Sequence, residues 1–452
     1  MDMTDGPLIG KIIKYSLPII ASGMLQLLYN AADMIVVGKF AETGSLAAVG
    51  ATGALINLLV NVFMGLSVGT CVVVARHYGA HEYEAANRAA HTSVTVSVLC
   101  GIFVGIAGFF LARPLLILMK TPPDVIERSV VYMKIFFVGI PANMLYNFGA
   151  AILRATGDTR RPLYYLGFAG IVNVILNLVF VICFKMGVAG VSTATIISQL
   201  ISAVLVIRCL FLSDGVCKIE YAKLKIDRAE LIKIAKIGIP AGIQGSVFSI
   251  SNVMIQSSIN SFGSIAMEGN TAAANLEGFI YNAMNSISQS ALSFTGQNYG
   301  AGKIRRIRLV LIYCCIIVTV IGLFMGITFY LLRVPLLSLY VNDPQMIEYG
   351  GLRMAYICAP YFFCGLMDVV SGAMRGLGRS TTPMVVSLLG ACLSRIIWIY
   401  TVFAAYPTLS VLYLSYPLSW ILTLAVHLIC YFTAYRHVRD RAEAEADAGA
   451  VV

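Results

Sequence analysis

The chain has 452 residues, of which 59% are hydrophobic and only 12% are charged. A soluble domain carries roughly 25% charged residues, so this composition excludes an ordinary water-soluble protein and indicates that most of the chain lies in lipid. The formal net charge of +10 favours an anionic neighbour, and the distribution of the basic residues decides between a nucleic acid and a membrane surface.

Apolar segments long enough to cross a bilayer recur along the whole sequence. A transmembrane helix needs about 20 apolar residues, and twelve segments approach that length. They are predicted near residues 15–37, 47–75, 91–112, 129–153, 162–184, 187–212, 231–261, 270–295, 307–331, 350–374, 382–404 and 409–435. They leave no room for a soluble domain, so the predicted fold is all-α and integral to a membrane. The first segment is interpreted as a span rather than a cleaved signal peptide, because it is long and its flank is acidic.

The basic residues gather on one side of these spans. Most of the 32 Lys and Arg residues fall where odd-numbered spans begin and even-numbered spans end, whereas a few, including Arg353, fall at the opposite ends. Cytoplasmic loops are the basic ones, so both termini are predicted to be cytoplasmic and the protein to lie in the cell (inner) membrane. The headgroups of membrane lipid are then the anionic neighbour, and no nucleic-acid partner is expected.

A polar segment divides the spans into six and six. The predicted organisation is an N-lobe at 1–212, a cytoplasmic linker at 213–236, a C-lobe at 237–435 and a cytoplasmic tail at 436–452. The tail is expected to be disordered, because it is highly charged and has few large apolar residues. The two lobes are expected to rock as near-rigid bodies about the linker.

The two halves repeat one another in sequence. Three pairs of motifs match in order at nearly one offset: IIKYSLP with IAKIGIP, ARHYGA with GQNYGA, and LRATGDTRRP with MRGLGRSTTP. Because six spans separate equivalent positions, both halves have the same orientation. The two six-helix lobes should then be related by a pseudo-two-fold axis along the membrane normal. Parallel repeats of this kind build transporters whose substrate site lies near the midplane.

Asp33 is the one acidic residue well inside the six spans of the N-lobe. A charge at the bilayer centre costs about 2.5–3.5 kcal/mol on insertion scales, so this carboxylate needs a polar partner, a water-filled cavity or a proton. At a helical rise of about 1.5 Å per residue, Asn173, Asn177 and Thr195 fall at a similar depth. This set offers oxygen ligands for Na⁺, or a polar pocket for a carboxyl group that gains and loses H⁺.

The C-lobe has its own ionisable residues inside the spans. Glu277 and Arg395 fall at similar depth, and we expect them to form an ion pair that neutralises both charges. Asp368 is equally compatible with a functional and a structural role. The candidate residues of the substrate cavity are Tyr29 and Asn30, which share the helix face of Asp33, together with Gln244, Gln256, Glu277, Asp368 and Arg395.

These motifs and their order resemble the multidrug and toxic compound extrusion (MATE) family of efflux transporters. The resemblance rests on Pro18 with Asp33 fifteen residues on, the YGA turns after spans 2 and 8, and the RATGDTRRP and MRGLGRSTTP loops. It covers most of the chain. The family implies a V-shaped fold of two lobes, alternating access, and export of amphipathic organic cations driven by H⁺ or Na⁺, with no cofactor.

The resemblance also assigns roles to residues. The family places its N-lobe cation site on an acid of the first helix, two polar residues four apart on the fifth, and a Thr on the sixth. Asp33, Asn173, Asn177 and Thr195 match those positions. The sodium-dependent branch adds an acid on helix 7, which this sequence lacks, and one on helix 10, where Asp368 stands. The choice between H⁺ and Na⁺, and the presence of a separate C-lobe cation site, therefore stay open.

Two other functions fit a multi-span membrane protein less well. A flippase for a lipid-linked headgroup would need several cationic residues facing the cavity, and the sequence places only Arg395 deep in the membrane. A membrane-embedded hydrolase would need a nucleophile with a base, or a metal triad, at one depth. We therefore expect a secondary-active antiporter, a monomer and not an enzyme, that exports small organic cations. The one metal expected is Na⁺ at Asp33, if sodium is the coupling ion.

Overall fold

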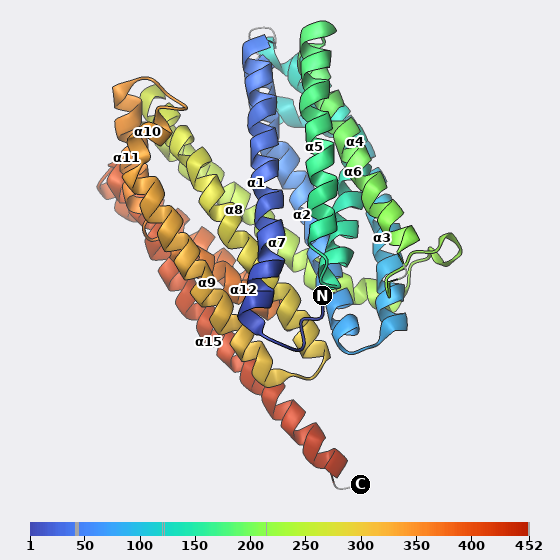
Figure 1. Ribbon diagram of the computed structural model, residues 1–452. Helices are drawn as coiled ribbons and strands as arrows, with labels where there is room; N and C mark the ends of the chain where they lie inside the picture. Colours follow the sequence, from blue (N-terminus) through green and yellow to red (C-terminus); the bar gives the residue numbers. More distant parts are fainter. Residues whose placement is uncertain (41–44, 120, 122, 214, 451–452) are drawn as a thin grey trace. The chain divides into compact units, whose positions relative to one another are not determined.

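The computed structural model describes residues 1–40, 45–119, 121, 123–213 and 215–450 (Figure 1). Helices make up nearly all of these residues, and no strand is present among them. The long helices are α1 (Leu8–Phe40), α2 (Ser45–Gly79), α3 (Tyr83–Leu118), α4 (Pro123–Ala155), α5 (Arg160–Leu178), α6 (Gly187–Leu212), α7 (Arg228–Asn260), α8 (Ser264–Gly300), α9 (Ile304–Leu331) and α15 (Leu409–Ala450). The shorter ones are α10 (Arg333–Leu337), α11 (Pro344–Ile357), α12 (Tyr361–Gly376), α13 (Thr381–Ser387) and α14 (Ser394–Trp398), the π-helices η1 (Val179–Cys183), η3 (Leu388–Leu393) and η4 (Ile399–Phe403), and the 3₁₀-helix η2 (Tyr221–Lys223).

Most of the twelve predicted membrane spans correspond to helices that could cross a membrane. Within the described ranges, ten helical stretches are long and apolar enough to cross a membrane, and α11 with α12, bent by 50°, makes an eleventh. The 37-residue helix α8 is long enough to cross as well, but it is less apolar and is not among these stretches. The predicted all-α, twelve-helix membrane fold is confirmed.

The helices pack into two compact units. Unit 1 comprises Met1 and Leu17–Ser246, and unit 2 comprises Asp2–Ser16 and Val247–Val452. These units follow the packing of the helices, whereas the lobe limits predicted at 1–212 and 237–435 follow the sequence repeat. The two divisions differ at α1, whose first turns pack with unit 2, and at α7, whose first half packs with unit 1.

Glycines bring α2 and α7 close together inside unit 1. A Cβ atom on Gly65 would overlap the backbone of Gly242, and one on Gly238 would lie 2.6 Å from the Cα of Leu66. Only residues without a side chain allow two backbones to approach this closely, as small residues four positions apart do in membrane helices. The first half of α7 therefore belongs to unit 1 because of these glycines.

We expect Gly65→Leu to prevent this packing, because the new side chain would have to displace backbone atoms. Overpacking costs typically about 1–3 kcal/mol, and backbone that cannot shift puts this site at the upper end. The monodisperse yield after detergent extraction should fall sharply, as measured by size-exclusion chromatography. Gly278→Leu is the matched control, since a Cβ there meets no atom within 4 Å. Equal yields of the two variants would contradict the close crossing.

The described residues of the linker pack against α3 in unit 1. The side chain of Asn87 donates hydrogen bonds to the carbonyl oxygens of Val216 (3.1 Å) and Lys218 (2.8 Å). Cys217 between them is buried, and burial raises the pKa of its thiol to about 12. The boundary between the units lies beyond this segment, at Ser246. This anchoring argues against the linker as the pivot of the expected rocking motion, which stays a prediction.

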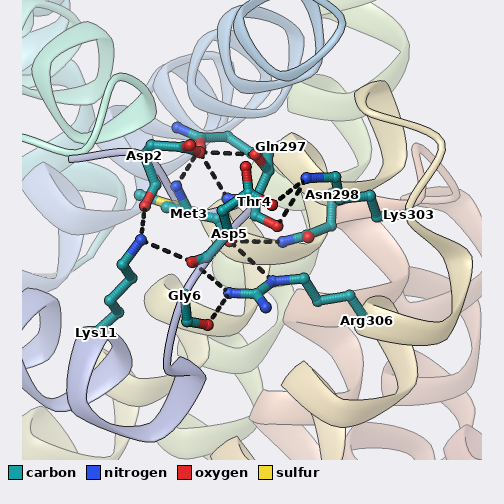
Figure 2. A network of polar contacts seen from close by, with 10 residues as sticks. All are labelled: Asp2, Met3, Thr4, Asp5, Gly6, Lys11, Gln297, Asn298, Lys303 and Arg306. Atoms are coloured by element: carbon teal, nitrogen blue, oxygen red, sulfur yellow. Dashed lines mark hydrogen bonds and ion pairs between the residues drawn. The ribbon is translucent and has the colours of Figure 1, made fainter.

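The segment before α1 docks into unit 2 (Figure 2). The backbone nitrogen of Met3 donates to Oε1 of Gln297 (3.1 Å), and its carbonyl accepts from Nδ2 of Asn298 (3.2 Å). Nη2 of Arg306 donates to the carbonyl oxygen of Asp5 (2.8 Å). The Met3 side chain is fully buried. These contacts explain why Asp2–Ser16 belongs to unit 2.

The repeated loop motif has the same local structure in both units. Helix α4 is followed by Gly157 at a φ of +90°, and α12 by Gly378 at +75°. In each case the glycine nitrogen bonds to the carbonyl of the Arg three residues earlier, Arg154 (3.0 Å) or Arg375 (2.7 Å). Glycine adopts this left-handed conformation without a steric penalty. The sequence match therefore reflects one kind of helix end, built twice.

The C-terminal tail is helical rather than disordered, which corrects the expectation from composition. Helix α15 continues to Ala450, and Figure 1 shows its last turns running on beyond the other helices of unit 2. Arg439 forms ion pairs with Asp440 (2.9 Å) and Glu443 (3.6 Å). The tail is rich in Ala, Arg and Glu, which favour helix even where no core covers them. Residues 451–452 of the predicted tail lie outside the described residues.

Candidate functional site

The four residues predicted for the cation site come together in unit 1. Nδ2 of Asn177, on α5, donates a hydrogen bond to Oδ1 of Asp33, on α1, and another to Oδ1 of Asn173 (3.2 Å). Oγ1 of Thr195, on α6, lies 3.4 Å from Oδ2 of Asp33. Both oxygens of the carboxylate therefore face polar side chains, while their role in ion coupling stays a prediction.

The geometry of α5 sets up this arrangement. Asn173 and Asn177 are four residues apart and therefore share a face of the helix. Both are buried, with 4% and 0% of their surface exposed. Helix α5 gives way to the π-helix η1 directly after Leu178, and π-helical turns are rare features found frequently at functional sites.

A cavity of about 600 Å³ opens beside Asp33 within unit 1. That volume lies in the range of pockets that hold small organic molecules. Asp33 is the one charged side chain among the described residues that line it. The other polar residues of the lining carry either a hydroxyl group or a carboxamide, and the carboxamides are Gln26, Asn30, Asn61, Asn143, Asn147, Asn173 and Gln199. The cavity is thus polar, mostly neutral, and negative at a single point.

Tyr29 and Asn30, both predicted cavity residues, line this space. The ring of Tyr29 lies against Gly170 on α5, where any Cβ atom would overlap it. Its hydroxyl donates to the carbonyl oxygen of Gly167 (3.2 Å). A glycine on α5 therefore lets the tyrosine of α1 pack flat and form part of the cavity wall.

Two states of the Asp33 carboxyl group fit these surroundings. As a carboxylate it accepts the Asn177 hydrogen bond and is an oxygen ligand of the kind that hard cations prefer. The Thr195 hydroxyl has one hydrogen, and when that hydrogen goes to the carbonyl of Val191 (3.0 Å), its lone pairs are free for an ion. Oδ1 of Asn177 is buried with no hydrogen-bond partner among the described residues. Such an acceptor is costly, and a cation or a protonated carboxyl would satisfy it.

Glu277 pairs with Arg353 and not with Arg395, so the predicted pair is wrong. Nε and Nη2 of Arg353 contact Oε1 (2.9 Å) and Oε2 (2.6 Å) of Glu277, and both residues are buried. Nη1 of the same Arg donates to Oδ1 of Asn270 (2.8 Å). Helix α11 begins at Pro344, which places Arg353 in its third turn. It therefore lies inside the span, and not at the outer end as predicted from the sequence.

Arg395 packs on aromatic rings instead. The centre of its guanidinium lies 4.4 Å from the ring centroid of Tyr416 and 5.9 Å from that of Trp420. Its Nε donates to Oγ of Ser419 (2.9 Å). The residue is 3% exposed, and no acidic side chain in the described part of the chain forms an ion pair with it.

Asp368 lies in another polar cluster of unit 2. Its carboxyl group lies near Tyr281, Asn285 and Arg375. Oγ of Ser288 donates to the backbone carbonyl of Asp368 (2.6 Å). These contacts suit a structural role and a functional one alike.

The two glutamines predicted for the substrate cavity lie outside the lining of the cavity beside Asp33. Nε2 of Gln256 donates to Oδ1 of Asn260 (2.9 Å), and its Oε1 accepts from Nδ2 of Asn270 (3.1 Å). Gln244 is buried in α7 within unit 1. Gln256 is thus part of the polar network that also holds the Glu277 ion pair.

The sequence model of the family described as MatE matches two stretches of this chain, residues 18–179 and 240–401. The chain belongs to the MATE family. The two matched stretches begin at Pro18 and Pro240 and coincide with the halves of the sequence repeat, so each half of this MATE protein carries the family pattern.

Named relatives and solved MATE structures cover most of the chain. It is 27% identical to the probable multidrug resistance protein YpnP of Bacillus subtilis, over 86% of this chain and 87% of that protein. It is 24% identical to a protein named FAD transporter in Shewanella oneidensis, over 85% and 86%. A MATE protein crystallised in complex with MaL6 shares the fold with a TM-score of 0.91 at 20% identity, over 97% of this chain and 98% of that one.

The protein is therefore a MATE multidrug efflux transporter, embedded in a membrane by many spans. These two relatives are named as a probable multidrug resistance protein and as a transporter, not as enzymes. The family predicted from the sequence motifs is confirmed, as is the fold of twelve helices in two lobes that the resemblance implied.

Two features of this MATE transporter were not predicted, although each has a signal in the sequence. Asp343 followed by Pro344 is a typical helix start, and the Asp side chain does cap α11. That signal would have placed Arg353 inside a span. Asn143 and Asn147 on α4 are spaced like the asparagines of α5, and Nδ2 of Asn147 donates to Oδ1 of Asn143 (3.1 Å).

Proposed function

We propose that this MATE transporter is a secondary-active antiporter that exports amphipathic, mostly cationic organic compounds in exchange for H⁺ or Na⁺ bound at Asp33. The supporting observation is the cavity of unit 1, whose described lining contains one charge, a carboxylate. A cationic compound and a coupling ion would both be attracted to that charge. Competition between them for one carboxylate is a direct way to link uptake of the ion to release of the compound.

The surroundings of Asp33 support an exchangeable ion rather than a fixed partner. No Lys or Arg is among the described residues of the lining, so the charge of the carboxylate is not neutralised by a permanent ion pair. Asn173, Asn177 and Thr195 supply neutral donors and acceptors, which adapt to a charged or a neutral carboxyl group.

The flippase alternative finds less support. A phosphate-bearing headgroup needs several cationic side chains, and the described lining of this cavity offers a carboxylate and carboxamides instead.

The same proposal includes the membrane location, the orientation and the oligomeric state of the protein. The excess of basic residues at one set of helix ends supports cytoplasmic termini and a place in the inner membrane. We propose that it works as a monomer, with the substrate path inside one chain.

Imposing the two ion gradients separately tests this function. The purified protein in proteoliposomes, loaded with ethidium, should move the dye when a pH gradient or a Na⁺ gradient is applied, and the gradient that suffices identifies the ion. Protein-free vesicles and vesicles without a gradient are the controls. Dye movement at one rate under all of these conditions would contradict coupled antiport.

A further inference from the structure

A series of aromatic rings, the aromatic ladder, leads to Arg395 in unit 2. The ladder consists of Tyr281, Tyr361, Trp420 and Tyr416. The ring centroids of Tyr281 and Tyr361 are 6.5 Å apart and those of Tyr361 and Trp420 are 5.1 Å apart, each pair nearly parallel at 24°. Tyr281 is 41% exposed, whereas Trp420 and Tyr416 are buried. The stacked rings therefore run from an accessible tyrosine inward to a buried guanidinium.

The charge of Arg395 is uncompensated, in contrast to that of Arg353 in the same unit. Arg353 has a bidentate carboxylate partner in Glu277. Arg395 uses only Nε, toward Ser419, and among the described residues no hydrogen bond or ion pair involves its two terminal nitrogens. Two aromatic faces lower the cost of burial but do not occupy those donors. A fixed pair of parallel N–H groups is thus left for a ligand.

The backbone around Arg395 is unusual as well. It lies on α14, a short α-helical piece between the π-helices η3 and η4. Single π-helical turns are rare and occur frequently at functional sites, because the extra residue rotates the side chains that follow. Arg395 thus lies in an irregular part of this span, with a π-helix on each side.

We propose that Arg395 binds an anionic group, a carboxylate or a phosphate, on a planar aromatic cargo whose ring stacks on the aromatic ladder. The planar guanidinium matches both oxyanions through two parallel hydrogen bonds, and Tyr281 and Tyr361, the two rings of the ladder that are not buried, offer faces for offset stacking. The inference rests on the proposed export function. It extends the cargo from amphipathic cations to aromatic compounds that carry an acidic group.

A purely structural role makes a different prediction. If Arg395 only braces the ladder through its contacts with Tyr416 and Trp420, its removal should weaken the binding of every aromatic ligand equally. If it holds an anion, its removal should affect ligands according to their charge. A pair of probes with the same ring and opposite charge separates the two roles.

The test measures binding of naphthoate and of naphthylmethylammonium to the full-length protein in phosphatidylcholine nanodiscs. The protein has two tryptophans, so a Trp398→Phe background leaves the fluorescence of Trp420, within the ladder, as the reporter. Arg395→Gln removes the positive charge, and Arg395→Lys keeps the charge but lacks the planar guanidinium group. Arg333→Gln is the matched control, because its guanidinium also lies over a tyrosine ring, at 4.6 Å from that of Tyr330, but outside the ladder.

We expect Arg395→Gln to weaken naphthoate binding by about 10- to 100-fold, the range for hydrogen bonds to a charged group, and to leave naphthylmethylammonium binding unchanged or tighter. Arg395→Lys should retain part of the naphthoate affinity, and it keeps the test valid if the Gln variant fails to fold. The control variant should bind both probes like the parent protein. Equal weakening of both probes, or no change in either, would overturn the proposal.

Two further arms assign the source of the anion and separate this inference from the proposed function. Naphthoate affinity should be the same in nanodiscs that contain phosphatidylglycerol; a loss there that Arg395→Gln abolishes would assign the site to a lipid phosphate and overturn the cargo proposal. Ethidium efflux is measured in parallel. Gradient-driven ethidium efflux without charge-dependent naphthoate binding would reject this inference alone, whereas charge-dependent binding without gradient-driven efflux would reject the proposed function.

Discussion

Asp33→Asn is expected to reduce gradient-driven ethidium efflux to the level of protein-free vesicles while the protein stays folded. Asparagine has nearly the volume of the aspartate and keeps a polar side chain toward Asn177 and Thr195, which bond to the carboxylate in the native protein. It cannot take up a proton or contribute a full negative charge to a bound Na⁺. The variant therefore resembles the neutral state permanently, and the exchange of ion for cargo has no second state to reach.

The neighbours of Asp33 should give a graded response. Asn177→Ala and Thr195→Ala each remove one hydrogen bond from the carboxylate, so efflux should fall by about two- to tenfold, the equivalent of one net hydrogen bond. Thr195 should have the smaller effect, because its contact is longer. Glu127→Gln is a matched control, since Glu127 is an exposed acid paired with Arg113 (2.7 Å) away from the cavity beside Asp33.

A wild-type efflux rate in Asp33→Asn vesicles would move the coupling site elsewhere. Asp368 would then be the next residue to replace, because the carboxylate of Glu277 already accepts hydrogen bonds from Nε and Nη2 of Arg353.

The group around Asp33 was predictable because local rules determine it. A rise per residue and a shared helix face place Asn173 and Asn177 at one depth, and a lone acid inside an apolar span must have polar neighbours. The same reasoning failed for Glu277 and Arg395. Depth along the membrane normal leaves the rotation of each helix undetermined, so two charges at one level can face different neighbours.

The composition of the two units was beyond such rules. Met3 bonds to Gln297, 294 residues away in the sequence, and no local pattern predicts a contact of that range. The glycines at Gly65 and Gly238 were visible, but which helix each one faces follows only from the packed structure. The spans and the repeat were therefore predictable from the sequence. The unit to which each end of α1 and α7 belongs depends on helix packing.

The Glu277–Arg353 pair should dominate the stability of unit 2. Removing one partner of a buried ion pair leaves an uncompensated charge and costs about 3–5 kcal/mol. Glu277→Gln should therefore lower the thermal unfolding temperature and the extracted yield strongly, since Asn270 and the ring of Tyr413, 5.7 Å from the guanidinium, compensate only part of the charge of Arg353.

The double variant Glu277→Gln with Arg353→Gln removes both charges and should recover much of that stability, because two neutral amides can bond to each other at this distance. Unfolding followed by size-exclusion chromatography after heating measures all three proteins under one condition. The charge exchange Glu277→Arg with Arg395→Glu provides the opposing arm. It should rescue nothing, since Arg395 contacts Ser419 and two aromatic rings rather than Glu277. Recovery in that exchange, and not in the Glu277 and Arg353 double variant, would refute the pairing described here.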